Sequence, residues 1–291
     1  MTTDICRLFD KKCTLRESHI WPNFTIDYIR ETGSQYLRNL NNPNKREQDG
    51  LKVYLLSDEA EQLFSKKEKW FSEKIFIPFL KNNVTSFQYD SNLYYFGISF
   101  LWRSLIMHLD FKPELQNEWW YPTLKKVNGE WINYLTNQII PKNYNNLQLM
   151  FTDRIKESNI HADGIDFYIT RALDITIITS DDKKYLAVYG KFLRFIFWSI
   201  IKTDEDKNNN VETTINEISG NISFPQIIND KYLLSFLTNR TNKIEELPKA
   251  SERQLELISK ERNKENGAFW KTDAGKSILN DLFKLNKKNS G

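Results

Sequence analysis

Cysteine and glycine are scarce in this sequence, and each shortage excludes a class of protein. The 291 residues include only two cysteines, so neither a disulfide framework nor secretion is expected. The 10 glycines do not form a glycine-rich phosphate loop, a nucleophile elbow or a dinucleotide fingerprint. We therefore expect no nucleotide cofactor.

Long apolar stretches are also missing. The longest, 93–109, is interrupted by Arg103 and falls short of the roughly 20 residues that span a bilayer. The chain does not open with a basic segment followed by an apolar run, so we expect no signal peptide. These features predict a cytoplasmic protein without membrane association, in which 93–109 is the main interior helix.

Net charge is likewise small. The formal charge of +3 is too low to indicate nucleic-acid binding by itself, although a local basic patch could still exist. By contrast, aromatic residues make up 14% of the chain, which is enough for a large core and argues against disorder.

The hydrophobic pattern predicts an α+β protein that is mostly helical. Apolar residues at helical spacing predict a first helix that Ser57 caps and that ends near Phe76, because Pro78 follows. Further helices are expected over 91–109 and 113–140, the latter with a break at 128–129. The asparagine-rich segment 33–50 is expected to be a loop.

The second half predicts a small antiparallel sheet. Extended segments are expected at 147–151, 165–179 and 184–201, with a turn at 180–183, and 192–201 is alternatively a helix. Terminal helices should follow at 232–237, at 251–262 with a Ser251/Gln254 capping box, and after a cap at Asp273. We divide the chain into 1–85, 86–141 and 142–291, which together form one compact unit.

The most informative motifs lie in the first seventy residues. They are Ser18-His19-Ile20-Trp21-Pro22, Gln48-Asp49-Gly50, and the residues Leu56, Glu61, Phe64, Glu68 and Phe71. In this order they resemble a group of bacterial HNH-like proteins, which belong to the ββα-metal nucleases. The resemblance covers about residues 1–80. It implies a strand-loop-helix module and associates the chain with bacterial defence or mobile-element systems.

The resemblance also implies a structural zinc ion held by two Cys-x-x-Cys knuckles, which this sequence does not retain. Cys6 remains, but Phe9 stands where its partner would be, and Cys13 is out of register. Ser57 and Ala60 occupy both cysteine positions of the second knuckle. A structural zinc ion needs four ligands, typically Cys or His. We therefore expect no zinc, a Ser57 helix cap in its place, and apolar filling by Phe9 and Ala60.

Catalysis is a separate question from zinc. In the family the histidine acts as a general base on water beside a divalent metal ion, which makes His19 the candidate base. Its further metal ligands would come from Asp49, Asn44, Glu61 and Glu68, with Mg²⁺ or Mn²⁺ as the ion. The alternative is a structural His19 that is hydrogen-bonded within its motif.

Other chemistry-bearing residues have simpler interpretations. Lys45 and Arg46 could contact phosphates, although a short basic loop is usually only solvated. His108 is expected in the core and His161 in an exposed loop. A metal cluster is less favoured than solvated turns and strand edges for the later aspartates Asp163, Asp166, Asp174, Asp181 and Asp182.

Three functions follow from these residues. The leading hypothesis is a zinc-free, non-catalytic HNH-like protein that binds nucleic acid or a partner protein. The alternative is an active metal-dependent endonuclease that uses His19 as general base. The third is a subunit of a larger assembly, which exposed Trp119 and Trp120 would favour.

Overall fold

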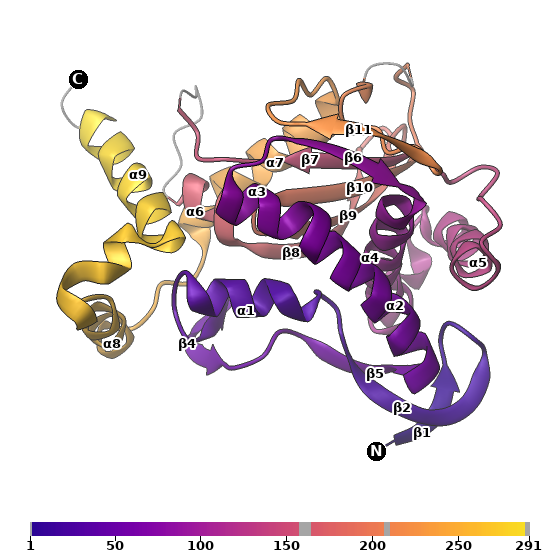
Figure 1. Ribbon diagram of the computed structural model, residues 1–291, viewed down its shortest axis with the longest axis horizontal. Helices are drawn as coiled ribbons and strands as arrows, with labels where there is room; N and C mark the ends of the chain where they lie inside the picture. The colour runs from indigo at the N-terminus through magenta and orange to yellow at the C-terminus, as the bar shows by residue number, and fades with distance from the viewer. Residues whose placement is uncertain (1, 157–163, 207–209, 289–291) are drawn as a thin grey trace.

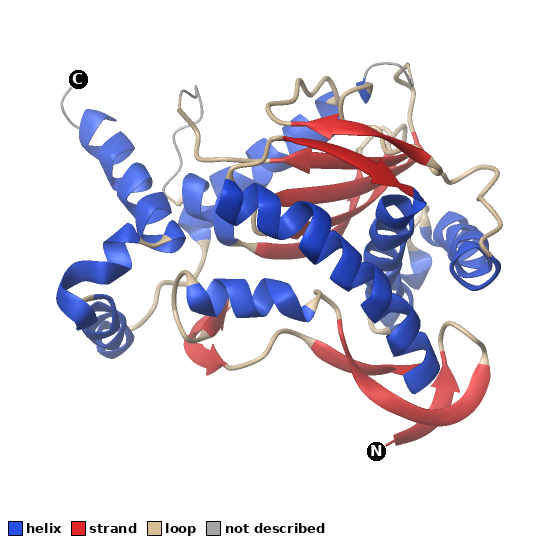
Figure 2. Ribbon diagram, in the orientation of Figure 1, coloured by secondary structure: helices blue, strands red, loops and turns tan. Residues whose placement is uncertain are grey.

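The computed structural model describes residues 2–156, 164–206 and 210–288. Its centre is an antiparallel four-stranded sheet of order β7-β10-β9-β8 (Figures 1 and 2). The four strands are β7 (Leu147–Phe151), β8 (Leu173–Thr179), β9 (Leu186–Phe192) and β10 (Phe195–Lys202). Helix α4 (Ser91–Asp110) packs on one face, and α7 (Lys231–Asn242) contributes to an apolar cluster on the other. The predicted α+β class is confirmed.

Burial on both faces explains why the strands lack alternation. Every residue of β9 is buried, as are the first six residues of β10, so their sequences are apolar almost throughout. The predicted turn at 180–183 connects β8 to β9. The alternative of a helix over 192–201 is wrong, because these residues lie mainly in β9 and β10.

Helix α4 approaches the sheet closely at two glycines. A Cβ at Gly97 would lie 2.6 Å from Leu147 Cδ2, and one at Gly190 would lie 2.5 Å from Phe100 Cε1. Both positions therefore need glycine for the helix to reach the strands.

The N-terminal segment forms a second antiparallel sheet, of order β1-β2-β5. Its strands are β1 (Thr2–Cys6), β2 (Lys11–His19) and β5 (Lys52–Ser57), with α1 (Asn23–Glu31) following β2. The expected loop at 33–50 instead contains a hairpin of β3 (Leu37–Asn39) and β4 (Asn42–Glu47). This hairpin lies beside α8 (Glu252–Arg262) in Figure 1.

The first predicted helix continues beyond its expected end. Helix α2 (Asp58–Phe71) passes through a π-helical turn, η1 (Ser72–Phe76), into α3 (Ile77–Asn82). Pro78 follows this π-helical turn directly and does not end the helix. The chain then enters β6 (Ser86–Asp90), which pairs with β11 (Ser219–Ser223).

The remaining helices correct several predictions. They are η2 (Pro113–Asn117), α5 (Tyr121–Asn137), α6 (Ile165–Arg171), η4 (Lys243–Glu246), η5 (Lys264–Lys271) and α9 (Asp273–Lys288). Helix α5 starts later than expected and is not broken at 128–129. Residues 165–171 are helical rather than extended. No helix among the described residues is both long and apolar enough to cross a lipid bilayer.

Two predicted helix caps are wrong. The Ser251 side chain makes no cap hydrogen bond, and its backbone N–H donates to Asn44 Oδ1 at 2.8 Å. At the last helix, Thr272 Oγ1 accepts from the backbone N–H of Gly275 at 3.2 Å. Asp273 instead accepts hydrogen bonds from Arg154 and Arg171. At the last helix, tertiary contacts therefore engage Asp273, and the neighbouring Thr272 provides the cap.

A buried lysine joins the N-terminal segment to the central sheet. Lys191 on β9 is fully buried, and its Nζ donates to the carbonyl oxygens of Ala172 and Leu193. Its own carbonyl oxygen accepts from Trp21 Nε1 at 3.0 Å. Burial lowers the pKa of Lys191 to about 7.

This lysine should make stability depend on pH. On unfolding, its pKa returns from about 7 to about 10.5, so the unfolded chain binds the additional proton between these values. The free energy of unfolding should therefore rise by about 2 kcal/mol from pH 7 to pH 9. Urea denaturation at both pH values should show a rise that Lys191→Met removes. An equal rise in the variant would contradict this assignment.

Candidate functional site

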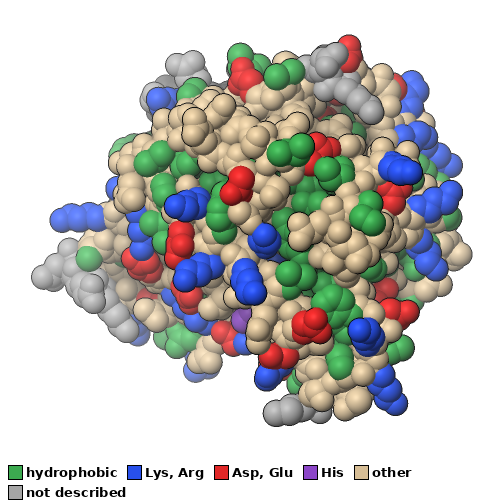
Figure 3. Space-filling view, turned by 45° about the vertical axis from the view of Figure 1, so that its right-hand side comes forward, with side chains coloured by type: hydrophobic (Ala, Val, Ile, Leu, Met, Phe, Trp, Pro, Cys, Tyr) green, Lys and Arg blue, Asp and Glu red, His purple; other side chains and the backbone are tan. Residues whose placement is uncertain are grey.

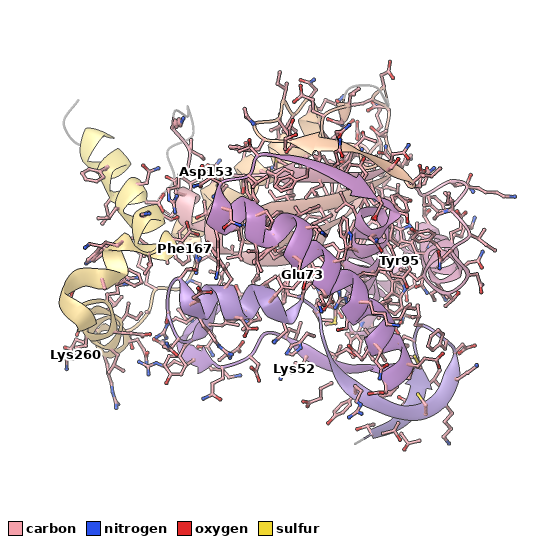
Figure 4. All side chains as sticks on the ribbon, viewed as in Figure 1. Lys52, Glu73, Tyr95, Asp153, Phe167 and Lys260 are labelled. Carbon is pink, nitrogen blue, oxygen red and sulfur yellow. The ribbon has the colours of Figure 1, made fainter. Side chains whose placement is uncertain are left out.

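His19 lies where two sheet strands meet two helices. It ends β2, directly opposite Lys52 of β5, which Figure 4 labels. Strand β5 continues into α2, and α4 packs against α2. We call Ser18, His19, Glu61, Glu68 and Arg103, which these elements bring together, the His19 cluster.

Arg103 anchors the His19 cluster from within α4. Its Nη1 donates to the His19 carbonyl oxygen at 3.0 Å, and its Nη2 forms an ion pair with Glu68 Oε1 at 2.7 Å. The Arg103 side chain is only 3% exposed. Buried charges require partners of this kind. The ion pair therefore fixes the end of β2 against both helices.

Three polar atoms in the cluster remain unsatisfied. Ser18 Oγ, His19 Nε2 and Glu61 Oε1 are buried and complete no hydrogen bond. Burial raises the pKa of Glu61, while the adjacent Ser18 hydroxyl acts to lower it. Burial, and secondarily the Lys52 ammonium group, lower the pKa of His19. Both effects favour the neutral form of His19, whose buried Nε2 has no hydrogen-bond partner.

The other predicted metal ligands are engaged elsewhere. The Asp49 carboxylate accepts hydrogen bonds from Lys52 Nζ at 2.8 Å and Arg30 Nη2 at 3.1 Å. The Lys52 bond lowers the pKa of Asp49. The Asn44 side chain accepts a hydrogen bond from the backbone N–H of Ser251, which directly precedes α8. Among the described residues, no three His, Cys, Asp or Glu side chains form a group that could hold a metal ion.

Three of the four positions compared above with zinc knuckles, Cys6, Ser57 and Ala60, meet in space. Cys6 Sγ accepts a hydrogen bond from the Ser57 backbone N–H at 3.3 Å. Ser57 Oγ in turn accepts from the Ala60 backbone N–H at 3.3 Å, as predicted for a helix cap. Ala60 is fully buried and Phe9 packs against the core. These residues do not fit a structural zinc ion, since only Cys6 carries a thiol.

The Ser57 cap should contribute measurably to stability. Ser57→Ala removes the acceptor for an N–H group in the first turn of α2, so the free energy of unfolding should fall by about 1 kcal/mol. Ser57→Asp restores an acceptor and should recover most of the loss. Urea denaturation of the three proteins gives the comparison. Equal stability of the alanine variant and the wild type would show that the cap is dispensable.

The other candidates do not join the cluster. Lys45 and Arg46 lie on β4, where Lys45 faces Glu47 and Arg46 lies 4.7 Å from the Tyr36 ring centroid. Charges of both signs are mixed over the face seen in Figure 3. A shallow groove of about 440 Å³ lies near Trp70 and β6 and does not include His19.

The remaining predictions are resolved residue by residue. Asp166 and Asp174 do not share a continuous strand, since Asp166 lies in α6 and Asp174 in β8. His108 is buried as predicted, and its Nδ1 lies 2.8 Å from the Ser104 carbonyl oxygen. Asp181 and Asp182 lie at the exposed turn before β9, whereas His161 and Asp163 lie outside the described residues.

Trp120 is only 6% exposed, so Trp119 and Trp120 do not form the exposed pair that would have favoured a larger assembly.

Sequence reasoning missed the roles of Arg103 and Lys52. A charged residue in the middle of a buried apolar helix needs an acidic partner, so Arg103 could have been singled out. Its partners, Glu68 and the His19 carbonyl, could not be identified without the packing of α2 on α4. Lys52 belongs to no recognisable sequence motif, and only the register of β2 and β5 places it opposite His19.

Comparison of the chain with family models, with characterised proteins and with solved structures found no match.

Proposed function

We propose that residues 1–85 form an HNH-like module that folds without zinc and binds nucleic acid without cutting it. The observation that carries this proposal is the exchange at the former knuckle. A hydrogen bond between Cys6 and Ser57, a helix cap and buried Ala60 fill the place where four thiolates would hold an ion. A module that has lost its zinc ion but retains its packing can still present a binding surface.

The electrostatics support binding over hydrolysis. Asp49 is held by Lys52 and Arg30, and Glu68 is held by Arg103, so neither carboxylate is free for a catalytic cation. Lys45 and Arg46 stand exposed on the hairpin of the same module and are suited to phosphate contacts.

Two measurements test this proposal. Elemental analysis of the purified protein should find no stoichiometric zinc, and an equimolar amount would reject the zinc-free part. Fluorescence anisotropy with labelled DNA and RNA should show binding that weakens with salt, because phosphate contacts release counterions. Absence of binding to either nucleic acid would contradict the proposal and favour a protein partner.

The second candidate function is a metal-dependent endonuclease with His19 as general base. The preference of His19 for its neutral form and the unpartnered Nε2 specifically favour it, since a general base needs a free nitrogen to take a proton from water. In the family, a divalent cation would offset charge on the scissile phosphate.

Cleavage assays with Mg²⁺ or Mn²⁺ on DNA and RNA separate the two functions. The nuclease predicts cleavage that is lost in His19→Ala while the circular dichroism spectrum stays that of the wild type. Cleavage that persists in His19→Ala would indicate a contaminating enzyme. We expect no cleavage by the wild-type protein.

A further inference from the structure

Three arginines gather between the β3–β4 hairpin and α8. Arg38 and Arg46 stand directly opposite each other in the hairpin register. Arg38 Nη1 reaches α8, where it donates to Gln254 Oε1 at 3.2 Å. Arg262 ends the same helix, and its pKa is lowered by burial and, to a lesser degree, by the charge of Arg38. Lys260, labelled in Figure 4, marks this part of α8.

The cluster brings like charges together. Like charges directly opposite on paired strands are destabilising. The Glu261 carboxylate, which interacts electrostatically with Arg38 and Arg262, already accepts from Ser34 Oγ at 3.1 Å and from the Gln35 backbone N–H at 3.2 Å. Burial and then Arg46 lower the pKa of Arg38. Arg38 Nη2 is buried and donates no hydrogen bond.

Aromatic rings hold the other two guanidinium groups in position. Arg46 lies 4.7 Å from the centroid of Tyr36, and Arg262 lies 5.3 Å from that of Phe269. Such stacking leaves the planar N–H groups at the ring edges available for ligands. Arg46 is exposed, so the cluster can be reached from solvent.

We propose that Arg38, Arg46 and Arg262 bind a phosphate group, supplied by the phosphodiester backbone of a nucleic acid. A phosphate seated on the exposed Arg46 would neutralise the opposed charges of Arg46 and Arg38, and guanidinium groups match phosphate geometry in pairs. This inference rests on the nucleic-acid binding proposed above. It extends the contact from the hairpin of the N-terminal module to a helix near the other end of the chain.

Anisotropy titrations of the full chain with a labelled oligonucleotide at several salt concentrations provide the test. Arg46→Gln should weaken binding roughly tenfold. It should also reduce the slope of log affinity against log salt by about one. Arg38→Lys keeps the charge but removes the planar guanidinium group, and it should also weaken binding. The matched control is Arg253→Gln on the exposed side of α8, which removes the same charge outside the cluster and should bind like the wild type.

A second arm separates nucleic acid from free phosphate. Inorganic phosphate should raise the melting temperature of the wild type more than that of Arg46→Gln. If the wild type binds the oligonucleotide and Arg46→Gln binds it equally well, this inference is wrong although the proposed function stands. If no nucleic acid binds, the proposed function fails. Phosphate stabilisation that depends on Arg46 would then identify free phosphate as the ligand, and its absence would overturn the phosphate site itself.

Discussion

Arg103→Ala is expected to lower the free energy of unfolding by about 3–5 kcal/mol, among the largest effects of any single substitution in this chain. Truncation leaves Glu68 without its ion-pair partner and the His19 carbonyl oxygen without its donor. The cost is large because the Arg103 side chain is 3% exposed, so water cannot replace it. Urea denaturation at pH 7 measures the loss.

Arg16→Ala is the matched control for this substitution. Arg16 pairs with Asp58 at 2.8 Å, but both side chains are more than half exposed, so its loss should cost less than about 1 kcal/mol. The double variant Arg103→Met, Glu68→Leu removes both buried charges and should recover much of the stability. Equal small losses for Arg103→Ala and Arg16→Ala would show that the buried pair does not anchor the cluster.

Phe71→Ala should destabilise the protein by a similar amount, about 3–5 kcal/mol. Phe71 is fully buried, and its ring stacks on Phe96 at 4.1 Å between centroids. The rings of Phe195 and Phe197 lie edge-on at 5.4 and 5.8 Å. The cavity would open where α2, α4 and the central sheet meet, so no single element could close it.

Phe111→Ala serves as the control, because Phe111 is 43% exposed and follows α4 without packing into this cluster. Its substitution should cost about 1 kcal/mol or less. Differential scanning calorimetry of both variants should show a melting temperature that falls much further for Phe71→Ala. Similar shifts in the two variants would mean that the aromatic cluster can repack around the gap.

The sequence allowed correct prediction of those elements whose signals are local. The apolar run predicted α4 to within a residue, at 91–109 against Ser91–Asp110. The Ser57 cap and the helix after it were predicted from residues within one turn. Each of these depends on side chains close together in the chain, which a periodicity or capping rule can detect.

Elements stabilised by distant residues were mispredicted. The N-terminus of α6 is capped by Asp281 of α9, whose oxygens accept from the backbone N–H groups of Asp166 and Phe167. Without that distant cap, the β-branched residues after Gly164 favour a strand. The β3–β4 hairpin likewise depends on α8, through the Arg38 bond to Gln254.

The candidate site was likewise predicted in part: some of its residues were identified correctly and one was not. His19, Glu61 and Glu68 were identified from their motif, and the structure brings them together with Ser18. Asn44 was grouped with them only by nearness in sequence, and its side chain turns to α8 instead. A motif identifies residues of the right chemistry, whereas their mutual distances depend on helix packing that no local pattern encodes.

The aromatic rings packed around Phe71 also determine where the chain can be divided into fragments. Phe71 shares its contacts with Phe24 of α1, Phe96 of α4 and rings of the central sheet, so the N-terminal module has no interior of its own on that side. A fragment that stopped at residue 85 would expose these rings to water and aggregate. Residues 1–85 therefore cannot be exchanged between proteins as an autonomous cassette.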